Sequence, residues 1–336
     1  MLELNVNTKS PAAITAAFKK IKEMVTSGAV SKNTPVHLVL EAGSYRESIR
    51  YNLSNPLIME SAPGTKAEDC VVQAENCESF NKGVENRSIF ALGPNVSRIT
   101  IRNFTVINTH MKSVEGNATA ADSAEAFLWN NTNGLLVAEG MRFESRQNTV
   151  CLKGCSRFTN CYFTGDVDFI YGDVDTALFE NCVIHIREDN RGDYNGYAVK
   201  SMAYANKMGF VFKDCTFTAD KRKKSRSYIY RTTGQGSALS PKNWDNAAII
   251  NCKISDMIDE ELVWDDDMNL NVYPRGNAKV GLREYNTQIM DKNGNLTPAD
   301  TGRHNIKSYL LTNQDYNNGY ATRYQILHDT LFASEM

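Results

Sequence analysis

The chain has 336 residues, of which 42% are hydrophobic and 23% are charged, and its formal net charge is −2. This composition is typical of a globular protein and does not favour disorder. A nearly neutral chain gives no reason to expect a nucleic acid partner, and the single dense basic run, Lys221–Arg226, is either a solvated turn or a patch for an acidic ligand. No apolar stretch approaches the ~20 residues of a membrane span, so we expect no membrane association.

The N-terminal residues and the cysteines bear on the compartment and on metals. If Met1 is the natural start, the lack of a continuous apolar core between Met1 and Val30 predicts a cytoplasmic protein. The eight cysteines are then expected to be reduced thiols rather than a disulfide framework. Cys151 and Cys155 lie four residues apart without an accompanying His pair or second Cys pair, so we do not expect a zinc site.

The first predicted element is an amphipathic helix over residues 10–28. Ser10 and Pro11 suit the N-cap and the first helical position, and Gly28 suits the position after the end. We expect this helix to cover the N-terminal end of the fold, before a first strand at Val36–Leu40. The apolar residues that share one face of the helix are Ile14, Phe18, Ile21 and Val25.

The middle of the chain carries a repeated six-residue pattern of apolar, polar, Asn/Asp/Gly, apolar, polar and apolar residues. Asn and Gly tolerate a left-handed backbone, so the third position suits a bend, and the alternation on either side directs every second side chain inward. Stacked units of this kind form a solenoid in which each coil buries its apolar face against its neighbours. The copies are Ile101–Val106, Ala138–Phe143, Phe158–Phe163, Phe179–Ile184, Phe212–Phe217 and Ile249–Ile254.

These patterns predict an all-β solenoid of parallel strands with an N-terminal capping helix. We expect the coils over about residues 36–285. The strand pattern fades over residues 286–336, which are expected to form an irregular C-terminal segment packed along the solenoid. No linker rich in Pro, Gly or Ser divides the chain, so we expect residues 1–336 to form a single domain. We also expect the protein to be a monomer.

One acidic residue stands inside a hydrophobic strand pattern. The segment Gly165–Gly172 reads Gly-Asp-Val-Asp-Phe-Ile-Tyr-Gly, and Asp168 lies between two apolar residues. Burial of an unpaired carboxylate is costly. The Asp168 side chain therefore either faces a solvent-filled groove or is held in place for chemistry.

Several motifs, taken in chain order, resemble the pectin methylesterases, which are carbohydrate esterases built on a single-stranded right-handed parallel β-helix. Gly43–Glu47 resembles the family's Gly-x-Tyr-x-Glu segment. Gly165–Gly172 resembles its Gly-x-Val-Asp-Phe-Ile-Phe-Gly signature, which implies that Asp168 is the nucleophile. Tyr228–Gly234 stands where the family has Leu-Gly-Arg-Pro-Trp-Gly, which implies that Arg231 orients the nucleophile. The substrate-binding residues that the resemblance implies are Tyr45, Phe169, Tyr230 and Thr233.

Two positions depart from the family's pattern. Its Gln-Asp-Thr motif aligns with Gln147-Asn148-Thr149, so the usual acid/base Asp is Asn148. Its Gln-Ala-Val-Ala-Leu motif aligns with residues 125–129, so the oxyanion-binding Gln is Glu125. Because Gln147 and Asn148 can both donate hydrogen bonds and Glu125 can hold a proton, we hypothesise that the acid/base and oxyanion roles are exchanged between adjacent coils.

The resemblance implies an aspartyl esterase that removes methyl groups from methylesterified galacturonate chains or oligosaccharides, with a pectin fragment as its partner and without a cofactor. Two alternatives stay open. Asn148, together with Thr233 in place of the family's tryptophan, is compatible with a protein that binds uronic-acid oligosaccharides without turnover. The architecture is also compatible with hydrolysis of another ester or with cleavage of a glycan, for which a lyase would need a calcium site and a glycosidase two suitably spaced acids.

Overall fold

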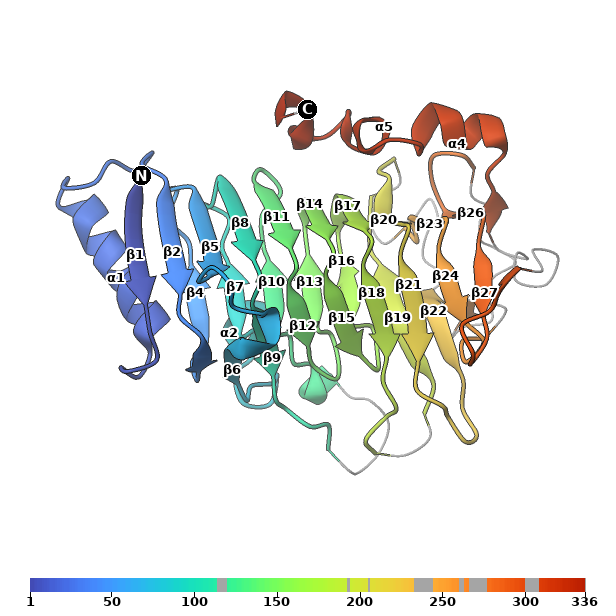
Figure 1. Ribbon diagram of the computed structural model, residues 1–336, viewed down its shortest axis with the longest axis horizontal. Coiled ribbons are helices and arrows are strands. Elements are labelled where there is room, and N and C mark those ends of the chain that lie inside the picture. The colour runs from blue at the N-terminus through green and yellow to red at the C-terminus, as the bar shows by residue number, and fades with distance from the viewer. Residues whose placement is uncertain are drawn as a thin grey trace.

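The computed structural model describes residues 1–113, 120–191, 194–204, 206–232, 244–259, 263–265, 277–299 and 308–335. In these ranges the chain winds into a long solenoid whose coils follow one another from the N-terminal to the C-terminal end (Figure 1). Successive coils pair strand to strand, and the described strands pair in parallel except for β27 with β28. The expected right-handed parallel β-helix is thereby confirmed.

Three sheets run along the solenoid, and neighbours in each sheet come from successive coils. The eleven-stranded sheet contains β1 (Leu2–Val6), β2 (Val36–Leu40), β5 (Leu57–Ser61), β8 (Arg98–Arg102), β11 (Leu135–Glu139), β14 (Gly154–Thr159), β17 (Val174–Glu180), β20 (Gly209–Lys213), β23 (Ala247–Ile250), β26 (Leu282–Tyr285) and β29 (Tyr309–Leu310). The ten-stranded sheet contains β3 (Gly43–Tyr45), β6 (Cys70–Ala74), β9 (Thr105–Asn108), β12 (Arg142–Glu144), β15 (Tyr162–Gly165), β18 (Val183–Ile186), β21 (Thr216–Ala219), β24 (Lys253–Ser255), β27 (Gln288–Met290) and β28 (Leu296–Pro298). The eight-stranded sheet contains β4 (Ile49–Tyr51), β7 (Phe90–Leu92), β10 (Phe127–Trp129), β13 (Val150–Leu152), β16 (Ile170–Gly172), β19 (Gly196–Ser201), β22 (Ser227–Thr232) and β25 (Val263–Asp265).

The helices lie at the ends of the solenoid and in loops that leave it. The α-helices are α1 (Ala13–Thr26), α2 (Val84–Arg87), α4 (Asn313–Gly319) and α5 (Arg323–Leu327), and the 3₁₀ helices are η1 (Ala67–Asp69), η2 (Ala120–Asp122) and η4 (Leu331–Glu335). Within the described residues, no helix has the length and apolar character needed to cross a lipid bilayer.

The capping helix α1 covers the N-terminal end of the solenoid, as expected (Figure 1). It begins at Ala13, three residues after the expected N-cap Ser10, because another side chain satisfies its first amides. The Glu47 carboxylate accepts hydrogen bonds from the backbone N–H of Ile14 at 3.0 Å and of Thr15 at 2.9 Å. A strand that the sequence did not predict, β1, precedes the helix and pairs with β2, so the first strand is β1 rather than Val36–Leu40.

The expected bends form a ladder between the eleven-stranded and the ten-stranded sheet. Each third position of the repeated pattern has a positive φ, between 52° and 61°. Asn, Asp and Gly adopt this left-handed backbone at lower cost than other residues. The ladder consists of Asn103, Gly140, Asn160, Asn181, Asp214 and Asn251, and Asn286 extends it by one further coil.

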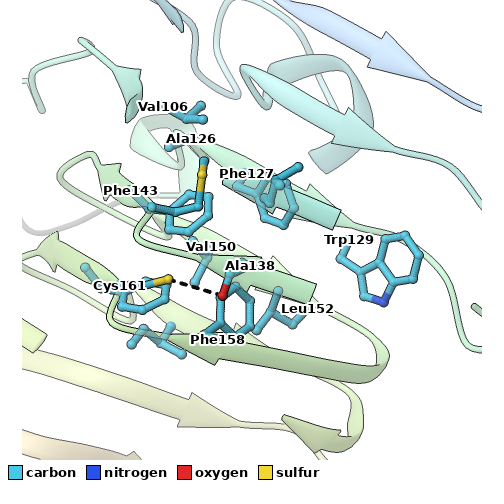
Figure 2. Close-up of a cluster of buried hydrophobic side chains, with 14 of the residues drawn as sticks. Val106, Ala126, Phe127, Trp129, Ala138, Phe143, Val150, Leu152, Phe158 and Cys161 are labelled. Atoms are coloured by element: carbon cyan, nitrogen blue, oxygen red, sulfur yellow. Dashed lines mark hydrogen bonds between the residues drawn. The ribbon is translucent and has the colours of Figure 1, made fainter. Parts of the chain in front are cut away.

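Aromatic and sulfur-containing side chains stack along the solenoid axis (Figure 2). Phe158 stacks on Phe179 with ring centroids 4.8 Å apart, and Phe143 stacks on Phe163 at 5.2 Å. The Cys161 thiol donates to the Ala138 carbonyl at 3.6 Å, and all eight cysteines are buried and free of disulfides. Truncation of one such phenylalanine to Ala costs about 3–5 kcal/mol, so this stack fixes the spacing of the coils.

The C-terminal segment follows the solenoid before it folds back along it. Strand β27 continues the ten-stranded sheet, so the coils extend past residue 285, where the sequence pattern placed their end. The helices α4 and α5 then lie across the outer face of the eleven-stranded sheet (Figure 1). Apolar residues of this segment, among them Ile326, Leu327 and Phe332, bury against Val137 and Leu178 of that sheet. The expected packing along the solenoid is therefore present.

Candidate active site

Asp168 and Asn148 occupy equivalent bends of adjacent coils. Asp168 lies between β15 and β16, and Asn148 lies between β12 and β13. Both have a left-handed backbone, with φ of 49° at Asp168 and 65° at Asn148. The Asn148 backbone N–H donates to the Val167 carbonyl at 3.1 Å, and Gln147 forms a parallel bridge with Val167. The two bends therefore lie side by side, each between a strand of the ten-stranded sheet and a strand of the eight-stranded sheet.

The Asp168 carboxylate is held through one of its two oxygens. Oδ2 accepts a hydrogen bond from Nη1 of Arg231 at 2.9 Å, and Nζ of Lys200 lies 3.5 Å from the same oxygen. Oδ1 is buried and accepts no hydrogen bond from the residues that the structure describes. The carboxylate is 9% exposed, whereas Lys200 and Arg231 are 27% and 25% exposed. Two cations therefore contact the carboxylate through Oδ2, and the buried Oδ1 is left without a hydrogen-bond donor among the described residues.

Strand alternation explains why Lys200 and Arg231 reach Asp168. In β19 and β22, Val199 pairs with Tyr230, and both side chains are buried in the core. Successive side chains of a strand point to opposite faces, so the next residues, Lys200 and Arg231, face outward. The same position in β16 is held by Tyr171, which pairs with Lys200.

Two tyrosines support the guanidinium that holds Asp168. The rings of Tyr197 and Tyr228 stack at 6.0 Å with an interplanar angle of 15°, and Val167 completes this apolar cluster. The Arg231 guanidinium carbon lies 5.2 Å from the centre of the Tyr197 ring. A cation over an aromatic face is favourable, so Tyr197 restricts the direction in which Arg231 points.

The side chains of Gln147 and Asn148 differ in their surroundings. Gln147 is 7% exposed, its Nε2 lies 3.5 Å from the Ser123 hydroxyl, and its buried Oε1 accepts no hydrogen bond from a described residue. Asn148 is half-buried at the bend. Both residues lie on the coil next to the Asp168 segment, and the backbone of Gln147 pairs with that of Val167.

Glu125 lies in register with Asn148 and Asp168 but turns its carboxylate to other partners. Its side chain is fully buried, and Arg87 of α2 donates to it from Nε at 2.5 Å and from Nη2 at 2.6 Å. The Tyr171 hydroxyl also donates to Glu125. Within the described part of the chain, the contacts of this carboxylate are with Arg87 and Tyr171 and not with Asp168.

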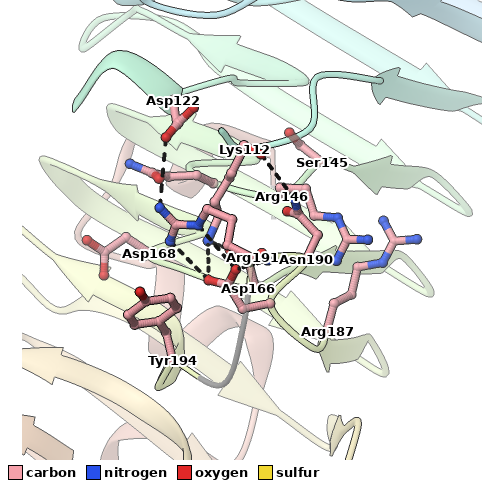
Figure 3. A network of polar contacts seen from close by, with 12 residues as sticks. Lys112, Asp122, Ser145, Arg146, Asp166, Asp168, Arg187, Asn190, Arg191 and Tyr194 are labelled. Atoms are coloured by element: carbon pink, nitrogen blue, oxygen red, sulfur yellow. Dashed lines mark hydrogen bonds and ion pairs between the residues drawn. The ribbon is translucent and has the colours of Figure 1, made fainter. Parts of the chain in front are cut away.

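A buried ionic network underlies the Asp168 segment (Figure 3). Lys112, which is fully buried, forms ion pairs with Asp166 and with Asp189, the latter at 2.9 Å. Arg191 donates to Asp189 at 3.1 Å and lies 3.9 Å from Asp122. Because Asp166 precedes the nucleophile candidate by two residues, the network ties that segment to three distant parts of the chain.

The two carboxylates that share Lys112 have opposite pKa shifts. Burial raises the pKa of Asp166 to about 6, although the Lys112 charge acts in the opposite direction. Burial also opposes ionisation of Asp189, but the hydrogen bonds from Arg191 and the Lys112 charge outweigh it and lower the Asp189 pKa to about 2. At neutral pH the network is held ionised by its own cations.

The substrate-binding residues expected from the resemblance do not face the candidate site. Tyr45 is buried in an N-terminal coil, with its hydroxyl 2.9 Å from the carbonyl oxygens of Val6 and Glu41. Phe169 is fully buried in the core, because it follows the bend on the inner side. Tyr230 is an inward-facing core residue, and burial raises its pKa. The expectation that these three residues bind substrate is therefore wrong. The fourth expected residue, Thr233, lies outside the described residues.

The sequence reasoning missed Lys200 and the ionic network of Lys112, Asp166 and Asp189. A signal was present for Lys200, since it is a charged residue within the apolar strand pattern Gly196–Ser201, as Asp168 is in its own. The network joins residues as far as 77 positions apart, and local patterns do not encode such partners. Within the described residues, no group of three or more His, Cys, Asp or Glu side chains is placed to hold a metal ion.

Comparisons with known proteins agree with this architecture. A family model described as Pectinesterase matches residues 11–279. Pectinesterase 4 of Arabidopsis thaliana is 25% identical over 122 residues, which cover 31% of this chain and 21% of that protein. Putative pectinesterase 14 of Arabidopsis thaliana is 23% identical over 240 residues, which cover 68% of each chain.

Solved structures extend the likeness to nearly the whole chain. Pectin methylesterase PemA from Erwinia chrysanthemi superposes with a TM-score of 0.70 at 18% identity, over 98% of both chains. A pectin methylesterase mutant in complex with a hexasaccharide gives the same TM-score, identity and coverage. At this level of identity the superpositions establish the fold.

Proposed function

Because this chain belongs to the pectinesterase family, we propose that it is a carboxylic ester hydrolase that removes methyl groups from methylesterified galacturonate chains or oligosaccharides, with Asp168 as the nucleophile. The substrate class is supported by the family and by the hexasaccharide complex of a pectin methylesterase with the same fold. The nucleophile is supported by the geometry of one carboxylate.

The observation that carries the proposal is the asymmetry of the Asp168 carboxylate. Arg231 and Lys200 contact Oδ2, so two cations face the carboxylate charge and fix the orientation of the group. Oδ1 has no hydrogen-bond partner among the described residues, so its lone pairs are not engaged. A nucleophile needs both properties, an ionised state and an atom free to form a bond.

The reaction then follows the acyl-transfer scheme. Oδ1 of Asp168 attacks the ester carbonyl carbon, and the carbonyl oxygen becomes an oxyanion. Collapse of this intermediate breaks the bond to the methoxy group, which leaves as methanol after it takes up a proton. Water then attacks the acyl group on Asp168 and releases the free uronate and the Asp168 carboxylate.

The amides of Gln147 and Asn148 are the proposed donors to the oxyanion. They lie on the coil next to Asp168, and Gln147 pairs with Val167. Neither amide exchanges a proton at neutral pH, but each carries an NH₂ group that can donate hydrogen bonds. Preorganised donors of this kind stabilise charge that develops in the transition state.

The contacts of Glu125 favour a positioning role over the acid/base role that the sequence suggested. A carboxylate that receives two hydrogen bonds from Arg87 is fixed in orientation and is not free to turn. Through the hydroxyl of Tyr171, Glu125 instead fixes a side chain three residues after Asp168. The hypothesis that roles are exchanged between coils therefore has support for oxyanion donors at Gln147 and Asn148. It has no support for Glu125 as the acid/base residue.

The test of the function is methanol release from methylesterified oligogalacturonides by the purified protein. We expect methanol in proportion to newly formed carboxylates. Fully demethylated oligogalacturonide serves as the blank, and an O-acetylated glycan tests for another ester. If calorimetry detects binding of the methylesterified oligosaccharide but no methanol is released, the protein is a binding protein and not a hydrolase. If acetate alone is released, the protein is an esterase for another substrate class.

A further inference from the structure

Lys200 is the cation at the candidate site that the sequence did not reveal. Its Nζ lies 3.5 Å from Oδ2 of Asp168, and its side chain is 27% exposed, so it contacts the nucleophile and is open to solvent. It stands on β19, one coil beyond Asp168, whereas Asn148 stands one coil before it. A substrate ester on Asp168 would therefore have the amides on one side and an ammonium group on the other.

Among the described residues, the arginine and the two amides placed next to Asp168 cannot move a proton in the reaction. Arg231 stays protonated in proteins, and the amides of Gln147 and Asn148 neither gain nor lose a proton at neutral pH. Glu125 is engaged by Arg87 and Tyr171. Yet the methoxy group that leaves is strongly basic and needs a proton as it departs.

We propose that Lys200 is the acid/base residue of this enzyme. It takes the role that Asn148 cannot perform, and it does so from the coil on the other side of Asp168. The proposal rests on the proposed esterase function with Asp168 as the nucleophile. Lysine is among the side chains that perform general acid/base catalysis, and the Lys200 amine is placed on the carboxylate that forms the covalent bond.

The proton balance closes over one turnover. In the first step the Asp168 Oδ1 bond to the acyl carbon forms, the bond to the methoxy oxygen breaks, and the Lys200 ammonium gives its proton to that oxygen. Methanol leaves and Lys200 is a neutral amine. In the second step this amine takes a proton from water, the resulting hydroxide oxygen bonds to the acyl carbon, and the bond to Asp168 breaks. Lys200 is again an ammonium group, and Asp168 again a carboxylate.

The position of Lys200 suits this sequence electrostatically. While Asp168 is a carboxylate, the adjacent Lys200 is stabilised as a cation. Once Asp168 is acylated, its negative charge is gone while the Arg231 charge remains nearby, so the Lys200 ammonium loses its stabilising partner. Lys200 therefore faces a negative charge before it donates its proton, and it faces no negative charge when it has to take a proton from water.

The test compares Lys200→Gln and Lys200→Arg with Lys207→Gln, a matched control. Lys207 is a 41% exposed lysine that pairs with Asp175 at 3.2 Å, away from Asp168. We expect Lys200→Gln and Lys200→Arg to lower kcat/KM for the methyl ester by roughly 10²–10⁴-fold and Lys207→Gln to leave it unchanged. An active Lys200→Arg variant would overturn the proposal, because Arg preserves the ion pair but cannot give up a proton.

Two further readouts separate acid/base chemistry from a structural or substrate-binding role. Trifluoroethyl esters leave without full protonation, so the loss in Lys200→Gln should be much smaller for them than for methyl esters. Alkylation of Lys200→Cys with 2-bromoethylamine restores an amine at nearly the same place, and the eight native cysteines are buried in the folded protein. We expect this treatment to restore methanol release, and failure of rescue would count against the proposal.

The two proposals fail in different ways. If Asp168→Asn abolishes methanol release while Lys200→Gln retains the wild-type kcat, the esterase stands and the role of Lys200 is wrong. If Lys200→Gln raises KM and leaves kcat unchanged, Lys200 binds the substrate and the acid/base role is wrong. If wild-type protein releases no alcohol from any ester, the proposed function itself fails.

Discussion

Arg87 and Glu125 form a bidentate salt bridge 38 residues apart in sequence, with Nε–Oε2 and Nη2–Oε1 distances of 2.5 Å and 2.6 Å. Glu125 is fully buried and Arg87 is 10% exposed. The pair fixes the short helix α2 against the coil that begins with β10, and the Tyr171 hydroxyl joins it to the coil of Asp168. An acid at this position thus has a structural explanation that the sequence alone did not provide.

Removal of one partner of this buried pair should destabilise the protein. Glu125→Gln leaves the Arg87 charge with a poorer partner, and we expect a loss of about 3–5 kcal/mol in the free energy of unfolding, measured by denaturant titration. Glu139→Gln is the control, because Glu139 is 38% exposed and each of its pairs, with Arg102 and with Arg157, contributes about 1 kcal/mol or less. At a temperature where Glu125→Gln is folded, its kcat should fall by less than 10²-fold, because Glu125 acts on the site only through Tyr171. A fall of 10²-fold or more would restore the acid/base role.

The role of Asn148 can be separated from its backbone conformation. With φ of 65°, Asn148→Ala should cost about 1–2 kcal/mol of stability, whereas Asn148→Gly retains the bend but loses the side-chain donor. If the amide stabilises the oxyanion, both variants should lower kcat by roughly 10²–10³-fold. Asn181→Gly, at a bend of another ladder, should release methanol as the wild type does. Wild-type kcat in Asn148→Gly would show that Asn148 is only a bend residue.

The bends were the part of the fold most readily predicted from sequence, because each is encoded within six residues. Asn160 and Asn181 each follow a polar residue and precede a buried cysteine, and both the backbone and the packing agree with that local pattern. Strand β1 escaped prediction because its partner β2 follows only after the intervening helix α1. Its five residues alone carry little periodic signal.

The site was predicted less completely than the fold. Asp168 and Arg231 were identified by their motifs, and the structure places them 2.9 Å apart. Tyr230 was expected to bind substrate, yet alternation in β22 directs it inward beside the outward-facing Arg231. The partner of Glu125 comes from a helix in a loop between β6 and β7, and a repeat pattern does not specify what such loops place against the coils.

The buried network gives stability a pH dependence with a definite sign. The Asp166 pKa is about 6 in the folded protein against an ordinary value of 3.8. Between these two pH values the folded protein keeps a proton on Asp166 that the unfolded chain has released. Its stabilising contribution is complete below about pH 4 and is lost as the pH rises through 6, by at most about 3 kcal/mol at about 1.4 kcal/mol per pKa unit. Asp166→Asn should remove this decline from the free energy of unfolding.

Asp189 provides a control of opposite sign for the same measurement. Its folded pKa of about 2 lies below the ordinary value of 3.8, so its contribution is present above pH 4 and is lost as the pH falls through 2. Asp189→Asn should therefore alter the stability curve below pH 4, and Asp166→Asn should alter it between pH 4 and 6. Parallel curves for wild type and Asp166→Asn would contradict the assignment.

The C-terminal segment should contribute to stability through its buried apolar contacts. Leu327 of α5 is fully buried in the cluster that joins this segment to the eleven-stranded sheet. Leu327→Ala should lower the free energy of unfolding by about 2–5 kcal/mol. Leu331→Ala, at a 44% exposed position in the same segment, should change it by about 0.5 kcal/mol or less. Equal effects would mean that the segment does not pack on the sheet as described.

The central claim is that Asp168 is the nucleophile of an esterase, and its most direct test is methanol release by Asp168→Asn beside Asp214→Asn. Both aspartates occupy left-handed bends, with φ of 49° and 56°, and asparagine tolerates that conformation. Asp214 pairs with Lys213 at a bend between β20 and β21, away from Arg231. We predict that Asp168→Asn releases no methanol above the blank and that Asp214→Asn matches the wild type. Release at the wild-type rate by folded Asp168→Asn would contradict the account.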